Sequence, residues 1–203
     1  ASWKMLLMRV EDGVWILDRL IELPSSVDGF LQWELNTLNA DTLYSMVVYT
    51  EEGRSSVVEF RTALEQNANR IVRFAATSCL GGNWSWPSLS IAASQRYDFF
   101  CFLGDAVYAD GSTSTSQYWQ HWSRTLSQQG FQDITSSTSL ICTWDDHEVD
   151  NNWSWNDFGI ETRFENAISM FRRALPQREG PGGTGIWRRL DWGETLSLFV
   201  LDG

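Results

Sequence analysis

The feature that most constrains the fold is a series of short apolar runs in the second part of the chain, separated by segments with helical spacing. The apolar runs cover residues 71–78, 97–103, 140–144 and 195–201, and the helical segments cover 89–96, 116–129 and 161–175. Strands that are apolar on both sides and alternate with helices predict an α/β sheet covered on both faces. A further short strand is expected over residues 186–190.

The first 65 residues show a different pattern, in which apolar and polar residues alternate. The pattern predicts strands over residues 4–10, 14–20, 30–36, 43–50 and 55–62, with turn residues between them. Closely spaced strands of this kind are typical of a small fibronectin- or immunoglobulin-like β-sandwich, here short of its first strands. Tyr44 fits the tyrosine corner of that fold, in which the hydroxyl bonds the backbone a few residues upstream. We therefore expect a sandwich over 1–65, a linker over 66–70 and an α/β domain over 71–203.

Composition excludes several classes of protein. The 203 residues are 43% hydrophobic, which is enough for a buried core, and they carry a formal net charge of −11. This acidity argues against a protein that coats nucleic acid, which needs a basic face. No apolar run approaches the roughly 20 residues that span a bilayer, and the first residues lack the basic region followed by an apolar region that we would expect of a signal sequence. Three cysteines are too few for a disulfide framework, and Cys101 and Cys142 lie inside apolar runs as expected core residues.

Metal-binding residue types follow the ends of the apolar runs. The groups concerned are Cys79, Asp105 with Tyr108 and Asp110, the Asp145–Asp146–His147–Glu148 block, and Asp202. Ligands bind outside the carboxyl ends of the strands in an α/β sheet, so these groups are predicted to share one edge. Crowded carboxylates raise one another's pKa unless a cation neutralises them. The sequence therefore predicts a metal site at this edge.

Simpler interpretations stay open for each of these residues. Tyr108 is also compatible with a packed aromatic, Cys79 with an inert residue at a strand end, and the 145–148 block with the start of a helix. The 12 tryptophans allow an alternative for the whole protein, a non-catalytic extracellular binding module with a tryptophan-rich surface.

Residues 141–152 and 102–108 resemble the PhoD-like alkaline phosphatases, a branch of the metallophosphoesterase superfamily. The sequence Cys-Thr-Trp-Asp-Asp-His-Glu in the first segment is the most specific part, and Gly-Asp-x-x-Tyr lies in the second. Residues 75–79, 186–193 and 199–202 resemble further strands of the family in the same order. The resemblance covers residues 71–203 and implies a metallophosphoesterase-like fold.

The resemblance also implies a metal centre and a reaction. Its expected ligands are Cys79, Asp105 and Tyr108 for ferric iron, and Asp105, Asp146 and, more weakly, Asp145 and Asn151 for a second metal, typically calcium. Other divalent metals are compatible with the same donors. His147 is expected beside the phosphate, where it stabilises charge or protonates the leaving group. The implied reaction is the hydrolysis of phosphomonoesters or phosphodiesters by a metal-activated hydroxide.

Three residues are expected to contact a small phosphoester substrate. Trp86 and Trp155 each belong to a Trp-Ser-Trp segment that follows a strand end, which predicts an aromatic wall, and Arg188 is a candidate for holding phosphate. The family completes its metal site with a downstream Gly-Asp-x-His block, which is absent from these 203 residues. This predicts that the chain is the front part of a longer enzyme, secreted or held in the periplasm or at the cell surface by resemblance. Nothing in the sequence indicates the oligomeric state.

Overall fold

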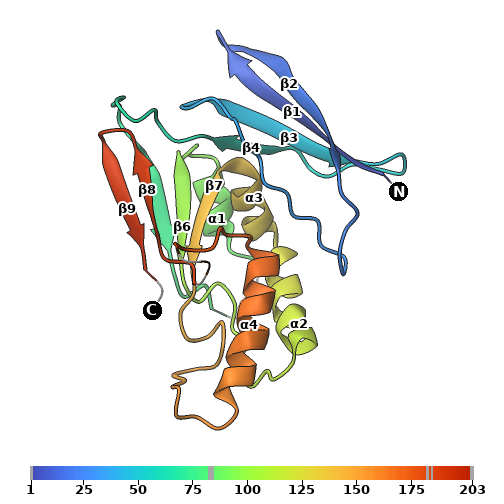
Figure 1. Ribbon diagram of the computed structural model, residues 1–203, viewed down its shortest axis with the longest axis vertical. Coiled ribbons are helices and arrows are strands. Elements are labelled where there is room, and N and C mark those ends of the chain that lie inside the picture. The colour runs from blue at the N-terminus through green and yellow to red at the C-terminus, as the bar shows by residue number, and fades with distance from the viewer. Residues whose placement is uncertain (1, 82–84, 182, 184, 202–203) are drawn as a thin grey trace.

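The computed structural model describes residues 2–81, 85–181, 183 and 185–201. The first part is one antiparallel sheet of four strands, β1 (Trp3–Glu11), β2 (Val14–Leu23), β3 (Leu43–Tyr49) and β4 (Val58–Arg61), in the order β2-β1-β3-β4 (Figure 1). Four of the five expected strands are thus present. The second sheet that a sandwich requires is not found among the described residues of this part of the chain.

The strand expected over residues 30–36 is wrong. This segment leaves the sheet and runs beside the helices (Figure 1). The Phe30 ring packs edge-on against Trp119 at 4.8 Å between centroids, and the Gln32 amide donates to the carbonyl oxygen of Arg172 at 2.8 Å. The apolar residues that suggested a strand therefore serve distant contacts, which alternation along the chain does not reveal.

The tyrosine corner is confirmed. The Tyr44 side chain is fully buried, and its hydroxyl accepts a hydrogen bond from the backbone N–H of Asn39 at 2.8 Å. The bond fixes the turn that leads into β3, and the Tyr44 ring stacks on Phe60 of β4 at 5.5 Å.

The second part is built on a parallel sheet of three strands, β5 (Phe74–Thr77), β6 (Phe99–Leu103) and β7 (Ser139–Thr143), in that order. The helices on one face are α1 (Pro87–Ala93), α2 (Thr115–Leu126), α3 (Gln129–Ser137) and α4 (Ile160–Ala174). The hairpin of β8 (Arg188–Trp192) and β9 (Leu196–Val200) covers the other face (Figure 1).

The side chains of β6 show why both faces are covered. Phe100 and Phe102 point into the core beneath the helices, whereas Phe99 and Cys101 pack against the hairpin. The prediction of a sheet buried on both faces is therefore confirmed. The last apolar run, however, forms the antiparallel strand β9 of the hairpin and does not join the parallel sheet. Cys101 and Cys142 are both buried, as expected.

The helix expected over residues 116–129 ends at Leu126, and a helix that the pattern did not predict, α3, follows at once. Gly130 allows this second helix to approach the loop before α1, because a Cβ at Gly130 would lie 2.2 Å from the carbonyl oxygen of Trp86. The one helix expected in this region is therefore two short helices, α2 and α3, and α3 packs against α1.

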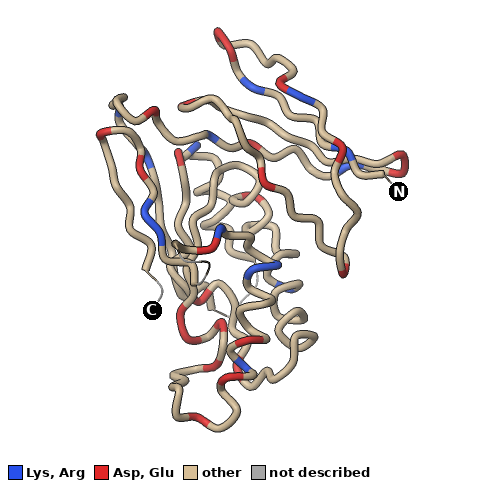
Figure 2. Tube along the Cα trace, in the orientation of Figure 1, with Lys and Arg blue, Asp and Glu red and all other residues tan. Residues whose placement is uncertain are grey.

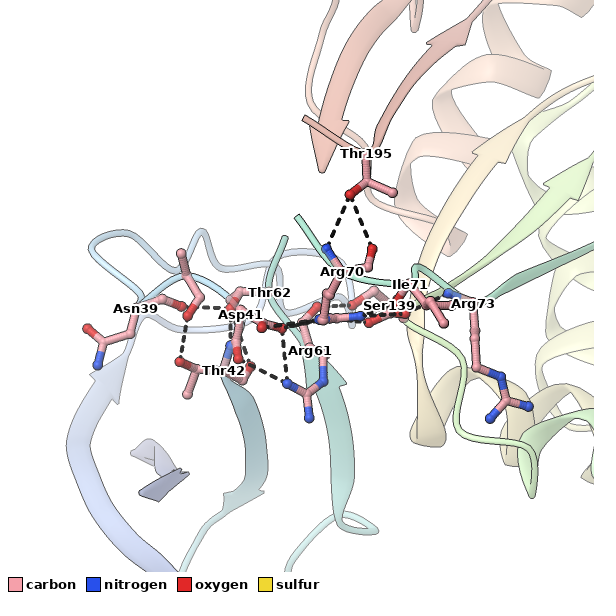
Figure 3. A network of polar contacts seen from close by, with 12 residues as sticks. Asn39, Asp41, Thr42, Arg61, Thr62, Arg70, Ile71, Arg73, Ser139 and Thr195 are labelled. Carbon is pink, nitrogen blue, oxygen red and sulfur yellow. Dashed lines mark hydrogen bonds and ion pairs between the residues drawn. The ribbon is translucent and has the colours of Figure 1, made fainter. Parts of the chain in front are cut away.

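The segment expected to be a linker, residues 66–70, is held on both sides. The Arg70 guanidinium bonds Asp41 of the N-terminal part at 2.6 Å (Figure 3) and Asp98, just before β6, at 2.5 Å. The Thr195 hydroxyl donates to the carbonyl oxygen of Arg70 at 3.1 Å. No helix of the described residues is long and apolar enough to cross a membrane.

Candidate metal centre

The carboxyl ends of the three parallel strands meet at one edge of the sheet, and short backbone bonds join the loops that follow them. The N–H of Cys79, after β5, donates to the carbonyl oxygen of Gly104, after β6, at 3.2 Å. The N–H of Ala109 donates to the carbonyl oxygen of His147, after β7, at 2.9 Å. Figure 2 shows acidic positions gathered in the loops at this end of the sheet.

Three of the predicted residues form a group that fits a metal ion. Asp105, Asp146 and His147 offer ligand atoms that all lie within 4.8 Å of one another. Asp105 is buried, and its Oδ1 atom accepts no hydrogen bond from any residue the structure describes. A buried carboxylate oxygen without a partner is costly unless a cation balances it. The two carboxylates suit a hard or borderline divalent or trivalent ion, and the His147 imidazole lies beside them.

Tyr108 contacts this group, and Cys79 is close enough to Tyr108 to affect its pKa. The Tyr108 hydroxyl lies 3.4 Å from Oδ2 of Asp105. Partial burial raises the pKa of Tyr108, and the negative charges of Asp105 and Cys79 raise it further. The phenol therefore stays protonated unless a cation is present to stabilise the phenolate. Cys79 is exposed with a left-handed backbone (φ 53°), and it lies outside the group of three.

Gly104 allows the loops after β6 and β7 to touch. Its φ is +99°, and a Cβ there would lie 2.4 Å from the Cβ of Asp145. Only glycine accommodates both the backbone conformation and the contact. Asp105 directly follows this close approach, which sets its position relative to Asp146.

Glu148 belongs to the expected acidic block, but it has a structural role that the sequence did not predict. Its side chain is 1% exposed, and its two oxygens accept hydrogen bonds from the N–H groups of Asp105 at 3.0 Å, Ala106 at 2.7 Å and Asp145 at 2.9 Å. Burial raises the pKa of Glu148 to about 7, although these N–H groups favour the carboxylate. One side chain thus ties the two loops that carry Asp105 and Asp146. The acidic block showed that Glu148 was present, but not that it points inward.

Asp110, which was expected at the same edge of the sheet, orients the predicted catalytic histidine, a role that the sequence did not predict. Its carboxylate oxygens lie 2.8 and 3.0 Å from Nδ1 of His147, and the His147 ring packs on Tyr108 at 4.2 Å. Partial burial lowers the pKa of His147, but the bond to Asp110 and the charges of Asp105 and Asp146 outweigh it, so the net pKa is raised. Nε2 of His147 has no hydrogen-bond partner among the described residues.

The weaker ligand candidates are placed differently. Asp145 is exposed, lies outside the group of three and contributes its N–H to Glu148. The Asn151 side chain is exposed and accepts a hydrogen bond from the amide of Asn152 at 3.1 Å. The backbone N–H of Asn152, rather than a side chain of this segment, reaches Asp146, at 2.5 Å. Asp202 lies outside the described residues.

The predicted substrate contacts are separated. Trp86 lines a pocket beside Tyr108, whereas Trp155 is 59% exposed and packs on Phe164 of α4 at 5.0 Å. No contact among the described residues joins the two tryptophans. The Arg188 guanidinium bonds the side chain of Gln177 and the carbonyl oxygen of Ile186, and neither partner belongs to the metal-binding group.

The chain is similar to one protein family and to solved phosphatase structures. The family model described as PhoD-like phosphatase matches residues 74–203. The solved structure of PhoD superposes with a TM-score of 0.76 at 19% identity, over 99% of this chain and 45% of that one. A purple acid phosphatase from yellow lupin (Lupinus luteus) seeds superposes with a TM-score of 0.59 at 15% identity, over 95% of this chain and 38% of that one. None of the curated proteins matches the chain.

The chain therefore spans less than half the length of the solved structures that it matches. At these identities the two structures show the fold, and they confirm the predicted metallophosphoesterase-like arrangement of sheets and helices. The family match covers well over half of the chain and includes every strand end that contributes to the metal-binding group. The chain belongs to the PhoD-like phosphatase family.

Proposed function

We propose that the protein is a metal-dependent phosphoester hydrolase that acts on small phosphomonoesters, phosphodiesters or both. The observation that carries the proposal is the buried Oδ1 atom of Asp105, which has no hydrogen-bond partner among the residues that the structure describes and lies in a group with Asp146 and His147. Membership of the PhoD-like family supports the same reaction class.

The residues present divide into two kinds of donor. Cys79 and Tyr108 offer a thiolate and a phenolate, which suit ferric iron, and Asp146 offers a carboxylate, which suits calcium or another divalent ion. Asp145 and Asn151 remain weaker candidates for the second site. When bound, such ions activate water and neutralise the charge that develops on phosphate.

The protein's own residues orient the catalytic histidine and the metal ligands, and they supply a proton to the leaving group. Asp110 holds Nδ1 of His147, so the ring is fixed with Nε2 as the nitrogen available to substrate. An imidazole in this position donates a hydrogen bond to the phosphate or a proton to the leaving alkoxide. Glu148 keeps Asp105 and Asp146 at a fixed separation through its backbone bonds. Export to the periplasm, cell surface or medium is part of the proposal by family resemblance.

Metal analysis and hydrolysis assays of the purified protein test this proposal. We expect stoichiometric bound metal, and hydrolysis of p-nitrophenyl phosphate or bis-p-nitrophenyl phosphate. Asp105→Asn should lose metal and lower kcat by about 100-fold or more, because it removes the carboxylate common to both sites. Tyr108→Phe should remove any visible absorption band that arises from tyrosinate bound to iron.

Asp12→Asn is a matched control, since Asp12 lies in the turn between β1 and β2 and has a left-handed backbone that asparagine also adopts. It should leave metal content and kcat unchanged. Full metal content and activity in Asp105→Asn would contradict the proposal. A metal-free, inactive protein would favour the alternative of a non-catalytic binding module.

A further inference from the structure

A pocket lies directly beside the metal-binding group, between the Asp105 loop and α2. Its inner wall is formed by Ala106, Val107 and Tyr108, which immediately follow Asp105 in the chain. The cavity has a volume of about 50 Å³ and is open to solvent, so it takes one part of a ligand while the rest stays outside. A ligand in the pocket therefore lies next to the phenol that contacts Asp105.

The wall opposite α2 is built in advance of any ligand. The Trp86 indole Nε1 donates to the carbonyl oxygen of Leu80 at 2.8 Å, which fixes the ring. The Trp86 backbone is held against Gly130, where no Cβ fits. Trp86 and Tyr108 thus offer aromatic surface to the same pocket, while Ala106 and Val107 offer apolar surface. Such a lining favours a planar aromatic group.

The mouth of the pocket carries one positive charge. His121, Arg124 and Gln128 of α2 and the turn after it reach the pocket from one side of the helix. Arg124 is exposed, and it forms no ion pair with any residue the structure describes, although the chain carries a net charge of −11. Burial lowers the pKa of His121 and the charge of Arg124 lowers it further, so the imidazole is neutral at pH 7. Arg124 is therefore the cation available to a ligand.

We infer that this pocket binds the leaving group of the substrate, and that the leaving group is an aromatic ring that carries a second negative charge. The inference rests on the proposed function for the phosphoester itself, and it adds the chemical class of the organic part. The ring lies between Trp86 and Tyr108, and the second anionic group pairs with the Arg124 guanidinium, which matches a carboxylate or phosphate in two-point contacts.

Two substrates that differ only in this charge test the inference: phenyl phosphate and 4-carboxyphenyl phosphate. Wild-type protein should have the higher kcat/KM with the carboxylated ester. Arg124→Gln should lower kcat/KM for that ester by about tenfold and change it less than about twofold for phenyl phosphate, because a partly exposed charge-assisted bond is lost. Arg54→Gln is the control; it removes an exposed arginine of the N-terminal part that forms no ion pair with any residue the structure describes. It should leave both values unchanged.

A binding measurement separates the failure of this inference from the failure of the proposed function. Because protein side chains alone form the pocket, 4-hydroxybenzoate should bind to the Asp105→Asn variant as well as to the wild type. Saturation-transfer NMR should show this binding, and Arg124→Gln should weaken it. If 4-hydroxybenzoate binds in a way that depends on Arg124 but neither ester is hydrolysed, the proposed binding pocket is supported and the proposed hydrolase function is rejected. Equal binding, or an equal preference between the two esters, in wild type and Arg124→Gln would overturn the inference.

Discussion

At the scale of single residues, the candidate site depends on groups that position its ligand atoms through contacts with other protein residues. Gly104 provides the space in which the loops after β6 and β7 meet, and Glu148 provides the acceptors that hold them. Asp110 fixes the ring of His147 in the same way. Ligand atoms supported by such partners stay in place before a metal or substrate arrives, which is how proteins achieve affinity and rate at metal sites.

Replacement of Glu148 by glutamine tests this support. Each carboxylate oxygen of Glu148 accepts a backbone N–H, and whichever way a glutamine turns, its NH₂ group faces at least one of these donors. We expect Glu148→Gln to lower the free energy of unfolding by about 2–4 kcal/mol, since buried N–H groups lose their acceptor. Urea unfolding followed by fluorescence measures the change.

The matched control for that variant is Glu165→Gln, at an exposed position of α4 where the side chain makes no hydrogen bond or ion pair with another described residue. It should change the free energy of unfolding by less than about 0.5 kcal/mol. If both variants were equally stable, Glu148 would not be the residue that joins the loops.

At the scale of elements, the carboxyl ends of parallel strands made much of the site predictable. Asp105, Asp146 and His147 follow strands directly, so their common edge could be inferred from local pattern alone. The inward direction of the Glu148 side chain could not be inferred in this way, because it depends on backbone N–H donors from two loops. The strand expected over 30–36 failed for a related reason: the partners of this segment lie on α2 and α4, far along the chain.

The tyrosine corner shows how one hydrogen bond sets the start of an element. The Tyr44 hydroxyl accepts the N–H of Asn39, just before β3. Tyr44→Phe should lower the free energy of unfolding by about 1 kcal/mol, since one hydrogen bond is lost while the buried ring is kept. Tyr49→Phe, at the other end of β3, removes a hydroxyl that makes no hydrogen bond with the described residues and should have little effect. Thermal unfolding followed by circular dichroism compares the two variants. Equal losses of unfolding free energy would show that the tyrosine corner does not contribute to stability.

At the scale of the whole molecule, the N-terminal sheet and the α/β part are joined by more than the chain. Arg70 lies between Asp41 and Asp98, and the Ser139 hydroxyl at the start of β7 donates to the carbonyl oxygen of Arg61 at the end of β4 (Figure 3). The bonds lie at the amino ends of the parallel strands, opposite the metal-binding group. The N-terminal sheet therefore braces the sheet from the end that carries no candidate chemistry.

This junction predicts a defined dependence of stability on pH. Burial raises the pKa of Asp98, but the hydrogen bonds from Arg70 and from the N–H of Arg73 lower it more, so the net pKa falls below the ordinary value of 3.8. The pKa of Asp41 is lowered as well, chiefly by its hydrogen bond from Arg70. For a carboxyl whose pKa is lower in the folded state, the added stability is complete above 3.8 and is lost as the pH falls through the lowered value.

Replacement of Asp98 by asparagine should therefore have an effect that depends on pH. Asp98→Asn removes the charge next to Arg70 and should lower the free energy of unfolding by about 1–3 kcal/mol at pH 7 and equally at pH 5. The difference from wild type should shrink as the pH falls below 3.8, where Asp98 of the unfolded chain takes up a proton, and should be smallest below the lowered pKa of Asp98 in the folded protein. Glu34→Gln is the control, since the Glu34–Arg178 pair is exposed on both sides and should contribute less than about 0.5 kcal/mol at any pH. A difference for Asp98→Asn that stayed constant down to pH 2.5 would mean that packing, and not the Arg70 ion pair, holds the two parts together.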